Sequence, residues 1–466
     1  MEPNTQLDVL LDQSGISRAG LAVRINRLGR EADVTLRYDH TAVARWLKGQ
    51  RPRGSVPELI CEVLGARVGR VLTLADIGMG GPPASSSPAS ESAAGEYGDA
   101  GQGATLGRFV ERAALSWRSD QLHAAPVSRT ARPAARPALL TGAAAVAPVW
   151  EWENPPEDLD VSHEGVREVS EVDVAVLHAA RGHYEHLYRN AGGVVTRPRV
   201  VGFLTGAVAP LLRGGYDDRT GRELCRAAGS LAAVSGICAY DADAQGLAQR
   251  YFHQALRLGK ASGDRLFGGY VVALLVNQAL FLGDNRRAIA CAEAVLRTPG
   301  SHSTPALATD LYAMQAKAYA RLGDRRGAHS CMGSAETFST RIRPEEEPEE
   351  TGYVEPGLVQ VRLAEALLVL GELGAAGRYA LEAARAPAHV RGRVNRLATL
   401  TDVELRSGST ERAAEAAVRM VEYAQGIESQ LLRQRMRRAR EHLLRYPGTP
   451  VAEAAKLIEE ALRVPL

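Results

Sequence analysis

The chain has 466 residues, of which 45% are hydrophobic, so it is long enough to form a small domain joined to a large one. An aromatic content of only 5% counts against a β-sandwich, and the 46 glycines suit helices that cross closely. The formal net charge of +2 is too small to indicate nucleic-acid binding by the molecule as a whole. A signal for such binding must therefore come from a local group of basic residues. We therefore expect an all-α protein.

The cysteines and the distribution of apolar residues indicate the cellular compartment of the protein. Five cysteines are scattered through apolar helical patterns and never form a C-x-x-C pair, which is typical of free thiols in a reducing cytoplasm. The first residues lack a basic stretch followed by an apolar one, and no later run of about 18 apolar residues follows. We expect a soluble cytoplasmic protein with no membrane partner.

Residues 1–79 are compact and patterned, and they predict a domain of five helices. Ser17 and Asp39 are suitable N-cap residues for the second and third helices. Apolar residues at helical spacing follow each cap, and Gly49 and Pro52 end the third helix. The predicted helices cover residues 6–14, 18–29, 41–48, 56–64 and 74–77.

The second and third helices and the chain around them carry a local excess of positive charge. Between Arg18 and Arg53 the sequence has nine basic residues and three acidic ones. A local excess of this kind is the electrostatic footprint of phosphate binding. For each single arginine, the alternative to a contact with DNA is a solvated side chain on the protein surface.

The outward residues of the third helix are the candidates for contact with DNA bases. Arg45 is the strongest, because a guanidinium can donate two hydrogen bonds to a guanine. The sequence leaves open whether Arg37 and Tyr38, in the segment between the two helices, also contact DNA. The residues that we expect to face base edges are His40, Thr41, Ala44 and Arg45. Those that we expect to hold phosphates are Arg18, Arg24, Arg37, Lys48, Arg51 and Arg53.

Two connecting regions follow the N-terminal segment. Residues 80–104 are mostly Gly, Ser, Ala and Pro, which predicts a flexible linker. Residues 105–165 predict a partly ordered connecting region, with one helix at 106–117 and then a stretch rich in Ala, Pro and Arg. From residue 166 to residue 466 helices alternate with short turns.

One turn recurs in this last region, in the form Leu-Gly-Asp or Leu-Gly-Glu followed by an alanine. It occurs at residues 282–288, 322–328 and 370–376, and more weakly at 406–413. A glycine can take the left-handed conformation that ends one helix, and an alanine lets the next helix approach closely. The alanines at this position are Ala248, Ala288, Ala328, Ala376 and Ala413. The recurrence predicts a solenoid of helix pairs, with an unrelated helical bundle as the alternative.

These motifs resemble two known families. Ser17 through Ile25 and Asp39 through Pro52 resemble the motif helices of the Cro/repressor-type helix-turn-helix domain, whose second helix lies in the major groove. Residues 30–38 form a longer connection than that family has. The recurring turn resembles that of tetratricopeptide repeats (TPR), which makes residues 166–466 a TPR-like α-solenoid. Together with residues 239–258, they resemble actinobacterial Cro/repressor-like (XRE-type) regulators with a C-terminal TPR domain.

This resemblance implies a transcription regulator of development or secondary metabolism. Its expected partner is double-stranded DNA with a palindromic operator. The repeat domain would carry the contact of a homodimer and would sense a peptide, small-molecule or protein effector. A TPR interaction scaffold without specific DNA binding is the alternative, and the basic recognition segment counts against it.

We expect no enzyme activity, no cofactor and no metal site. The sequence has no Walker A motif, nucleophile elbow or Rossmann fingerprint. His178, His183, Glu185 and His186 suggest a metal cluster, but His178 lies about 140° around a helix from His183. The acidic run at residues 343–350 is typical of a solvated loop between repeats.

Overall fold

The computed structural model describes residues 4–31, 36, 38–50, 52, 56–68, 72, 74, 76–79, 105–124, 137–297 and 302–463. The chain divides into two compact units, Met1–Glu91 and Ser92–Leu466. In the described residues the regular elements are helices, accompanied by two isolated bridges, His163 with Tyr216 and Glu168 with Gly215. The all-α prediction is therefore confirmed. None of the helices in this described part is long and apolar enough to cross a membrane.

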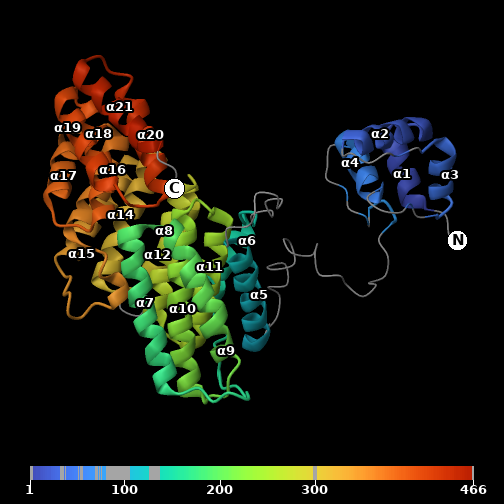
Figure 1. Cartoon of the computed structure of the whole chain (residues 1–466), viewed down its shortest axis with the longest axis horizontal. Coiled ribbons are helices and arrows are strands. Elements are labelled where there is room, and N and C mark those ends of the chain that lie inside the picture. Colours follow the sequence, from blue (N-terminus) through green and yellow to red (C-terminus); the bar gives the residue numbers. More distant parts are fainter. Residues whose placement is uncertain are drawn as a thin grey trace. The chain divides into compact units, whose positions relative to one another are not determined.

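In the described part of the N-terminal unit, four helices surround one small core (Figure 1). Its helices are α1 (Thr5–Ser14), α2 (Arg18–Glu31), α3 (His40–Leu47) and α4 (Val56–Val68). Leu7, Ile25, Val43, Ile60 and Leu64 are fully buried between them. Each helix contributes residues at helical spacing, so the predicted amphipathic pattern accounts for this core.

The segment for which the sequence predicts a fifth helix, residues 74–77, differs from that expectation. Leu74 and residues 76–78 lie in turns, and the Met79 amide donates to the Leu74 carbonyl at 2.8 Å, five residues back. Gly78 has a φ of +68°, which a right-handed helix does not allow. The Asn4 side-chain amide donates to the Ile77 carbonyl at 2.8 Å, so a contact with the start of the chain shapes this turn.

The larger unit holds the remaining helices. They are α5 (Leu106–Ala124), α6 (Ala143–Glu153), α7 (Glu171–Ala191), α8 (Gly193–Phe203), the π-helix η1 (Leu204–Val208), α9 (Ala209–Leu212), α10 (Asp218–Asp241), α11 (Gln245–Ser262), α12 (Arg265–Phe281), α13 (Asn285–Leu296), α14 (Pro305–Arg321), α15 (Arg325–Ser339), the 3₁₀ helix η2 (Glu349–Thr351), α16 (Pro356–Leu370), α17 (Leu373–Arg385), α18 (Val390–Arg406), α19 (Thr410–Ala424), α20 (Gln430–Leu443) and α21 (Thr449–Arg463).

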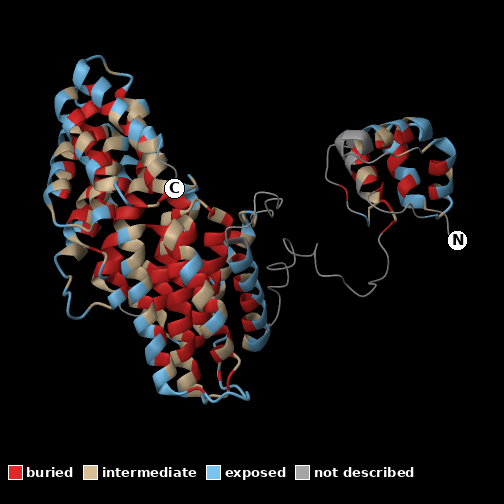
Figure 2. Ribbon diagram, viewed as in Figure 1, coloured by how far each residue is buried: buried red, intermediate tan, exposed pale blue. Residues whose placement is uncertain are grey.

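From α10 onward these helices form consecutive pairs that stack as a solenoid (Figure 1). The first members, α10, α12, α14, α16, α18 and α20, each contact the next first member along the chain. Before the pairs, α7 and α8 pack on α10, and α5 packs on α8. Buried residues are concentrated inside the stack and exposed ones on its outer faces (Figure 2).

The recurring turn has the conformation that its sequence predicts. Gly283, Gly323, Gly371 and Gly408 all have a φ between +79° and +81°. At two of these turns the aspartate after the glycine caps the next helix, since Asp284 accepts from the Arg287 amide at 3.2 Å and Asp324 from the Gly327 amide at 2.8 Å. The alanines that follow in the second helices, Ala288, Ala328, Ala376 and Ala413, are fully buried.

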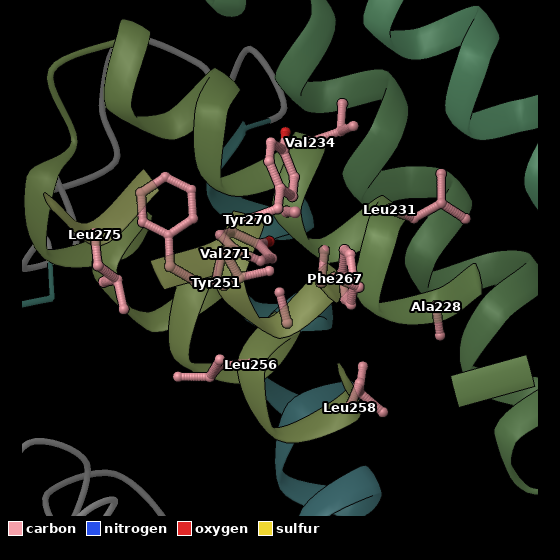
Figure 3. Packing of buried hydrophobic residues seen from close by; sticks show 14 of the residues in the cluster. Ala228, Leu231, Val234, Tyr251, Leu256, Leu258, Phe267, Tyr270, Val271 and Leu275 are labelled. Atoms are coloured by element: carbon pink, nitrogen blue, oxygen red, sulfur yellow. The ribbon is translucent and has the colours of Figure 1, made fainter. Parts of the chain in front are cut away.

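Large side chains fill the space between the first helix pairs. Figure 3 shows buried side chains that α10, α11 and α12 contribute to one hydrophobic core, among them Leu231, Tyr251 and Phe267. A Cβ atom at Gly236 would lie 2.5 Å from the Phe252 ring, so only glycine lets α10 and α11 approach at this point. A second hydrophobic core, formed by α14 to α21, continues the stack.

The larger unit also incorporates α5 and α6, which lie in the region that the sequence predicts as partly ordered. The Trp117 indole donates to Gln254 Oε1 of α11 at 2.8 Å, and Asp120 accepts from the Tyr251 hydroxyl at 2.8 Å. Trp152 of α6 is 1% exposed. The sequence predicts a helix at residues 106–117, and α5 continues it to Ala124. It does not predict α6, whose Trp152 meets the His302 ring 150 positions away.

Candidate nucleic-acid interface

Local capping fixes the start of α2 and of α3. The Ser17 hydroxyl accepts from the Gly20 amide at 3.1 Å, and the Asp39 carboxylate accepts from the amides of Thr41 and Ala42 at 3.1 and 3.0 Å. Both predicted N-caps are thus present. The Thr41 hydroxyl, which donates to Asp39, and the Ala42 amide lower the pKa of the Asp39 carboxyl. Asp39 is therefore ionised at neutral pH, as a helix N-terminus favours.

The buried face of α3 anchors it in the N-terminal unit. Ala42, Val43 and Trp46 are buried, and the Tyr38 ring meets the Trp46 ring edge-on with their centroids 5.2 Å apart. The helix ends at Leu47 with Lys48 as its C-cap, and Gly49 follows with a φ of +94°. The N-cap Asp39, the turn at Gly49 and the buried face therefore fix the position of this short helix.

The opposite face of α3 carries the residues predicted to contact DNA. His40, Thr41, Arg45 and Lys48 are exposed and Ala44 is half-buried. At 100° per residue they cover one side of the helix. Arg18, exposed at the start of α2, belongs to the same set of predicted contacts. The exposed acidic residues Asp8 and Asp12 lie on α1, so α1 and α3 differ in the sign of their exposed charge.

Two of the predicted contact residues have neighbours within the protein. The half-buried Arg24 donates from its guanidinium to the Gly20 carbonyl at 3.3 Å, one turn earlier in α2. Tyr38 is half-buried, and its ring supports Trp46. Arg37, Arg51 and Arg53 lie outside the described residues.

Sequence reasoning missed two asparagines that hold this interface in place. Asn26 of α2 accepts from the Tyr38 amide at 2.9 Å and donates to the Tyr38 carbonyl at 2.7 Å, so it fixes the chain just before α3. The Asn4 backbone amide donates to the Leu47 carbonyl at 2.8 Å, and the Asn4 side-chain oxygen caps α1. The preference of asparagine for N-caps could have indicated the role of Asn4 in α1. No local pattern indicates a contact between residues 26 and 38.

The histidines that suggested a metal cluster lie on α7. Glu185 forms ion pairs at 2.5 Å with Arg181 and with Arg189. The His186 ring lies 3.1 Å from the Asn190 side-chain amide. Within the described ranges no group of three or more His, Cys, Asp or Glu side chains is placed to hold a metal ion.

Comparison with known proteins concerns the N-terminal unit. Residues 7–80 match the family model of the SP15 N-terminal domain. The matched residues contain α2, α3 and α4 and most of α1, so the similarity covers the whole candidate interface. No curated protein matches the chain.

Proposed function

We propose that this chain is a sequence-specific DNA-binding transcription regulator in which α3 enters the major groove. The observation that carries the proposal is the division of α3 into a buried face around Trp46 and an exposed face with His40, Thr41, Arg45 and Lys48. An amphipathic helix whose free face is basic and whose start is capped can enter the major groove without rearrangement.

The proposed roles follow from side-chain chemistry. Arg45 donates two hydrogen bonds to a guanine, His40 and Thr41 contact neighbouring base edges, and the Ala44 methyl group packs against a thymine methyl. Arg18 and Lys48 bind phosphates and set the register. Arg24 would have to leave the Gly20 carbonyl to do so, and Tyr38 supports α3 through Trp46.

For the larger unit we propose a TPR-like domain that carries the dimer contact and responds to an effector. Its stacked helix pairs and their glycine turns support the likeness to TPR proteins. The whole chain would then be an XRE-type regulator of the actinobacterial kind, acting in the cytoplasm on development or secondary metabolism. It would not be an enzyme.

Light scattering tests the dimer. A regulator that reads two half-sites about one helical turn apart must present two copies of α3, so the purified chain should have twice the mass of one copy at micromolar concentration. A single-copy mass under those conditions would contradict this part of the proposal.

The DNA-binding proposal is tested by genome-wide immunoprecipitation followed by fluorescence anisotropy with a recovered operator. Replacement Arg45→Ala should weaken specific binding about 10- to 100-fold, because a bidentate contact contributes about 1–3 kcal/mol to base discrimination. Arg67→Ala is the matched control, since Arg67 is an exposed arginine in the last turn of α4. Equal effects of the two replacements, or no binding to duplex DNA at low salt, would favour an interaction scaffold instead.

A further inference from the structure

One edge of the helical stack has no part in the proposed DNA contact. At this edge the first helix of a pair turns into the second, at residues 282–284 after α12, 322–324 after α14 and 371–372 after α16. We call these three turns, with the last turn of the helix before each and the first turn of the helix after it, the turn edge. Arg406, at the end of α18, belongs to it as well, because its guanidinium donates to the Leu368 carbonyl of α16 at 2.7 Å.

Hydrogen bonds across the stack place these turns side by side. Arg321, at the end of α14, donates to the Leu280 carbonyl of α12 at 2.6 Å. Arg325, at the start of α15, donates to the Leu370 carbonyl of α16 at 2.9 Å and pairs with Glu372 at 2.5 Å. The first helices themselves also contact one another, α12 with α14 and α14 with α16. The turn edge is therefore one continuous surface of the larger unit.

A row of exposed apolar side chains runs along the turn edge, with one at the end of each first helix. Phe281 of α12 is 41% exposed, Leu322 directly after α14 is 46% exposed and Val369 of α16 is 43% exposed. The Phe281 ring meets the Tyr240 ring with their centroids 5.4 Å apart, so its position is fixed. Single exposed apolar residues are common on protein surfaces, but a row of them at equivalent positions indicates a contact surface.

The turn edge also has an excess of positive charge, since it contains six arginines and three carboxylates. The carboxylates are engaged within the protein. Asp284 lies 3.3 Å from Arg287, and Asp324 caps α15. Glu372 is the partner of Arg325. Four exposed arginines form no ion pair with the residues that the structure describes, and they are Arg286, Arg321, Arg326 and Arg406. The surface is therefore complementary to an acidic partner.

We propose that the turn edge binds an acidic amphipathic helix of a partner protein. Packed helices lie about 8–10 Å apart, and seven residues of an α-helix rise about 10.5 Å. A partner helix that crosses the three turns therefore places an apolar residue at every seventh position against Phe281, Leu322 and Val369. Acidic residues three and four positions after each apolar residue lie on the same side of that helix, where they reach the arginines.

This partner accounts for both features of the surface, whereas the alternatives account for one. The phosphates of a nucleic acid would neutralise the arginines but leave the apolar row in water. An anionic membrane binds a broad apolar face, and the row is one side chain wide. The inference rests on the proposed effector response of the larger unit, whose effector it identifies as a helical segment of a protein. It does not depend on the proposed contact between α3 and DNA.

Fluorescence anisotropy with the full chain and a labelled synthetic peptide tests this surface. The peptide has about 22 residues, with leucine at every seventh position, glutamate three and four positions after each leucine, and alanine elsewhere. Wild-type protein should bind it with a dissociation constant below about 100 μM, and weaker binding than that would overturn the proposal. Arg326→Glu should weaken binding about tenfold or more, because it sets like charges against each other.

Arg385→Glu is the matched control, since Arg385 is an exposed arginine at the end of α17 that lies away from the turns. A glutamate near the start of α15 is favoured by the helix dipole, so Arg326→Glu should fold normally. Leu322→Asn tests the apolar row and should weaken binding about fivefold, with Leu381→Asn, at a 38% exposed position of α17, as its control. Equal effects within either pair of variants would count against the turn edge as the binding surface.

Two further probes identify the class of partner, namely vesicles of phosphatidylserine with phosphatidylcholine and an unrelated DNA duplex. If Arg326→Glu abolished binding to either probe and left peptide binding unchanged, the turn edge would contact a membrane or nucleic acid and the proposal would be wrong. Arg45→Ala should leave peptide binding unchanged. A protein that binds its operator but not the peptide would refute this inference alone, and the DNA-binding proposal would stand.

Discussion

The two units of the chain use charged residues in opposite ways. On α3, His40, Arg45 and Lys48 are exposed and form no ion pair with the residues that the structure describes. In the larger unit Asp241 is fully buried and Arg391 is 7% exposed, with their charged atoms 2.5 Å apart. Paired charges join parts of one fold, whereas unpaired charges on an ordered helix are available to a partner.

The largest effect should come from breaking the buried pairing in the larger unit. Asp241 accepts from the Gly193 amide at 2.7 Å and the Ser429 hydroxyl at 2.6 Å, besides its ion pair with Arg391. It therefore connects α10 with α8, α18 and the start of α20. Asp241→Ala leaves Arg391 buried without its counter-ion and should cost about 3–5 kcal/mol of stability, measured by urea unfolding followed by circular dichroism.

An exposed ion pair of the same unit provides the control. Arg219 and Glu171 lie 3.5 Å apart with side chains 76% and 75% exposed. Arg219→Ala should change the stability by less than about 0.5 kcal/mol, because solvent screens both charges. If Asp241→Ala cost no more than this, the buried network would not be what connects α10 with α8, α18 and the start of α20.

The next effect depends on pH. Burial alone would raise the pKa of Glu350, but Arg226, with its Nη2 2.8 Å from the carboxylate, and Arg181 hold it below its ordinary value of 4.5. A depressed pKa contributes stability above pH 4.5, and this contribution is lost as the pH falls through the lower folded value. Glu350→Gln should cost about 2 kcal/mol near neutral pH and less at about pH 3, as shown by urea unfolding at a series of pH values.

A parallel loss at every pH would contradict this reasoning, since it would mean that the glutamine fits poorly for reasons unrelated to charge. Glu345→Gln is the control. Glu345 is an exposed member of the same loop, and its replacement should leave the pH dependence unchanged.

In both units, the sequence predicted the features that depend on contacts between residues close together in the chain. The caps by Ser17 and Asp39 and the glycine turns at 283 and 323 involve residues within three or four positions of one another, and the structure contains them as predicted. The all-α solenoid follows from repetition of such local units. The exposed face of α3 was predictable for the same reason, because helical periodicity places His40, Thr41 and Arg45 opposite Trp46.

Contacts between distant residues were not predictable. Asp241 and Arg391 are 150 positions apart, and nothing near either residue indicates the other. The extension of α5 beyond residue 117 brings Asp120 to the Tyr251 hydroxyl, and the turn that contains Leu74 and Gly78 depends on Asn4. In each case a tertiary contact outweighs the local composition or helix propensity.

The smallest change in stability, with the clearest change in function, should come from Lys48. Because Lys48 is exposed at the end of α3, Lys48→Ala should change the stability of the protein by less than about 0.5 kcal/mol. If its ammonium binds a phosphate, the slope of log affinity against log salt should become shallower by about 1, for operator and unrelated duplexes alike. Anisotropy titrations at several salt concentrations measure this slope.

The unrelated duplex and the Arg67→Ala control make this measurement decisive. A loss confined to the operator would mean that Lys48 reads bases, and an unchanged slope would mean that it is only a solvated end of the helix. Either result would remove Lys48 from the phosphate contacts. It would also weaken the contrast between the units, because an exposed charge without a partner on α3 would then have no more function than the exposed Arg219 of the larger unit.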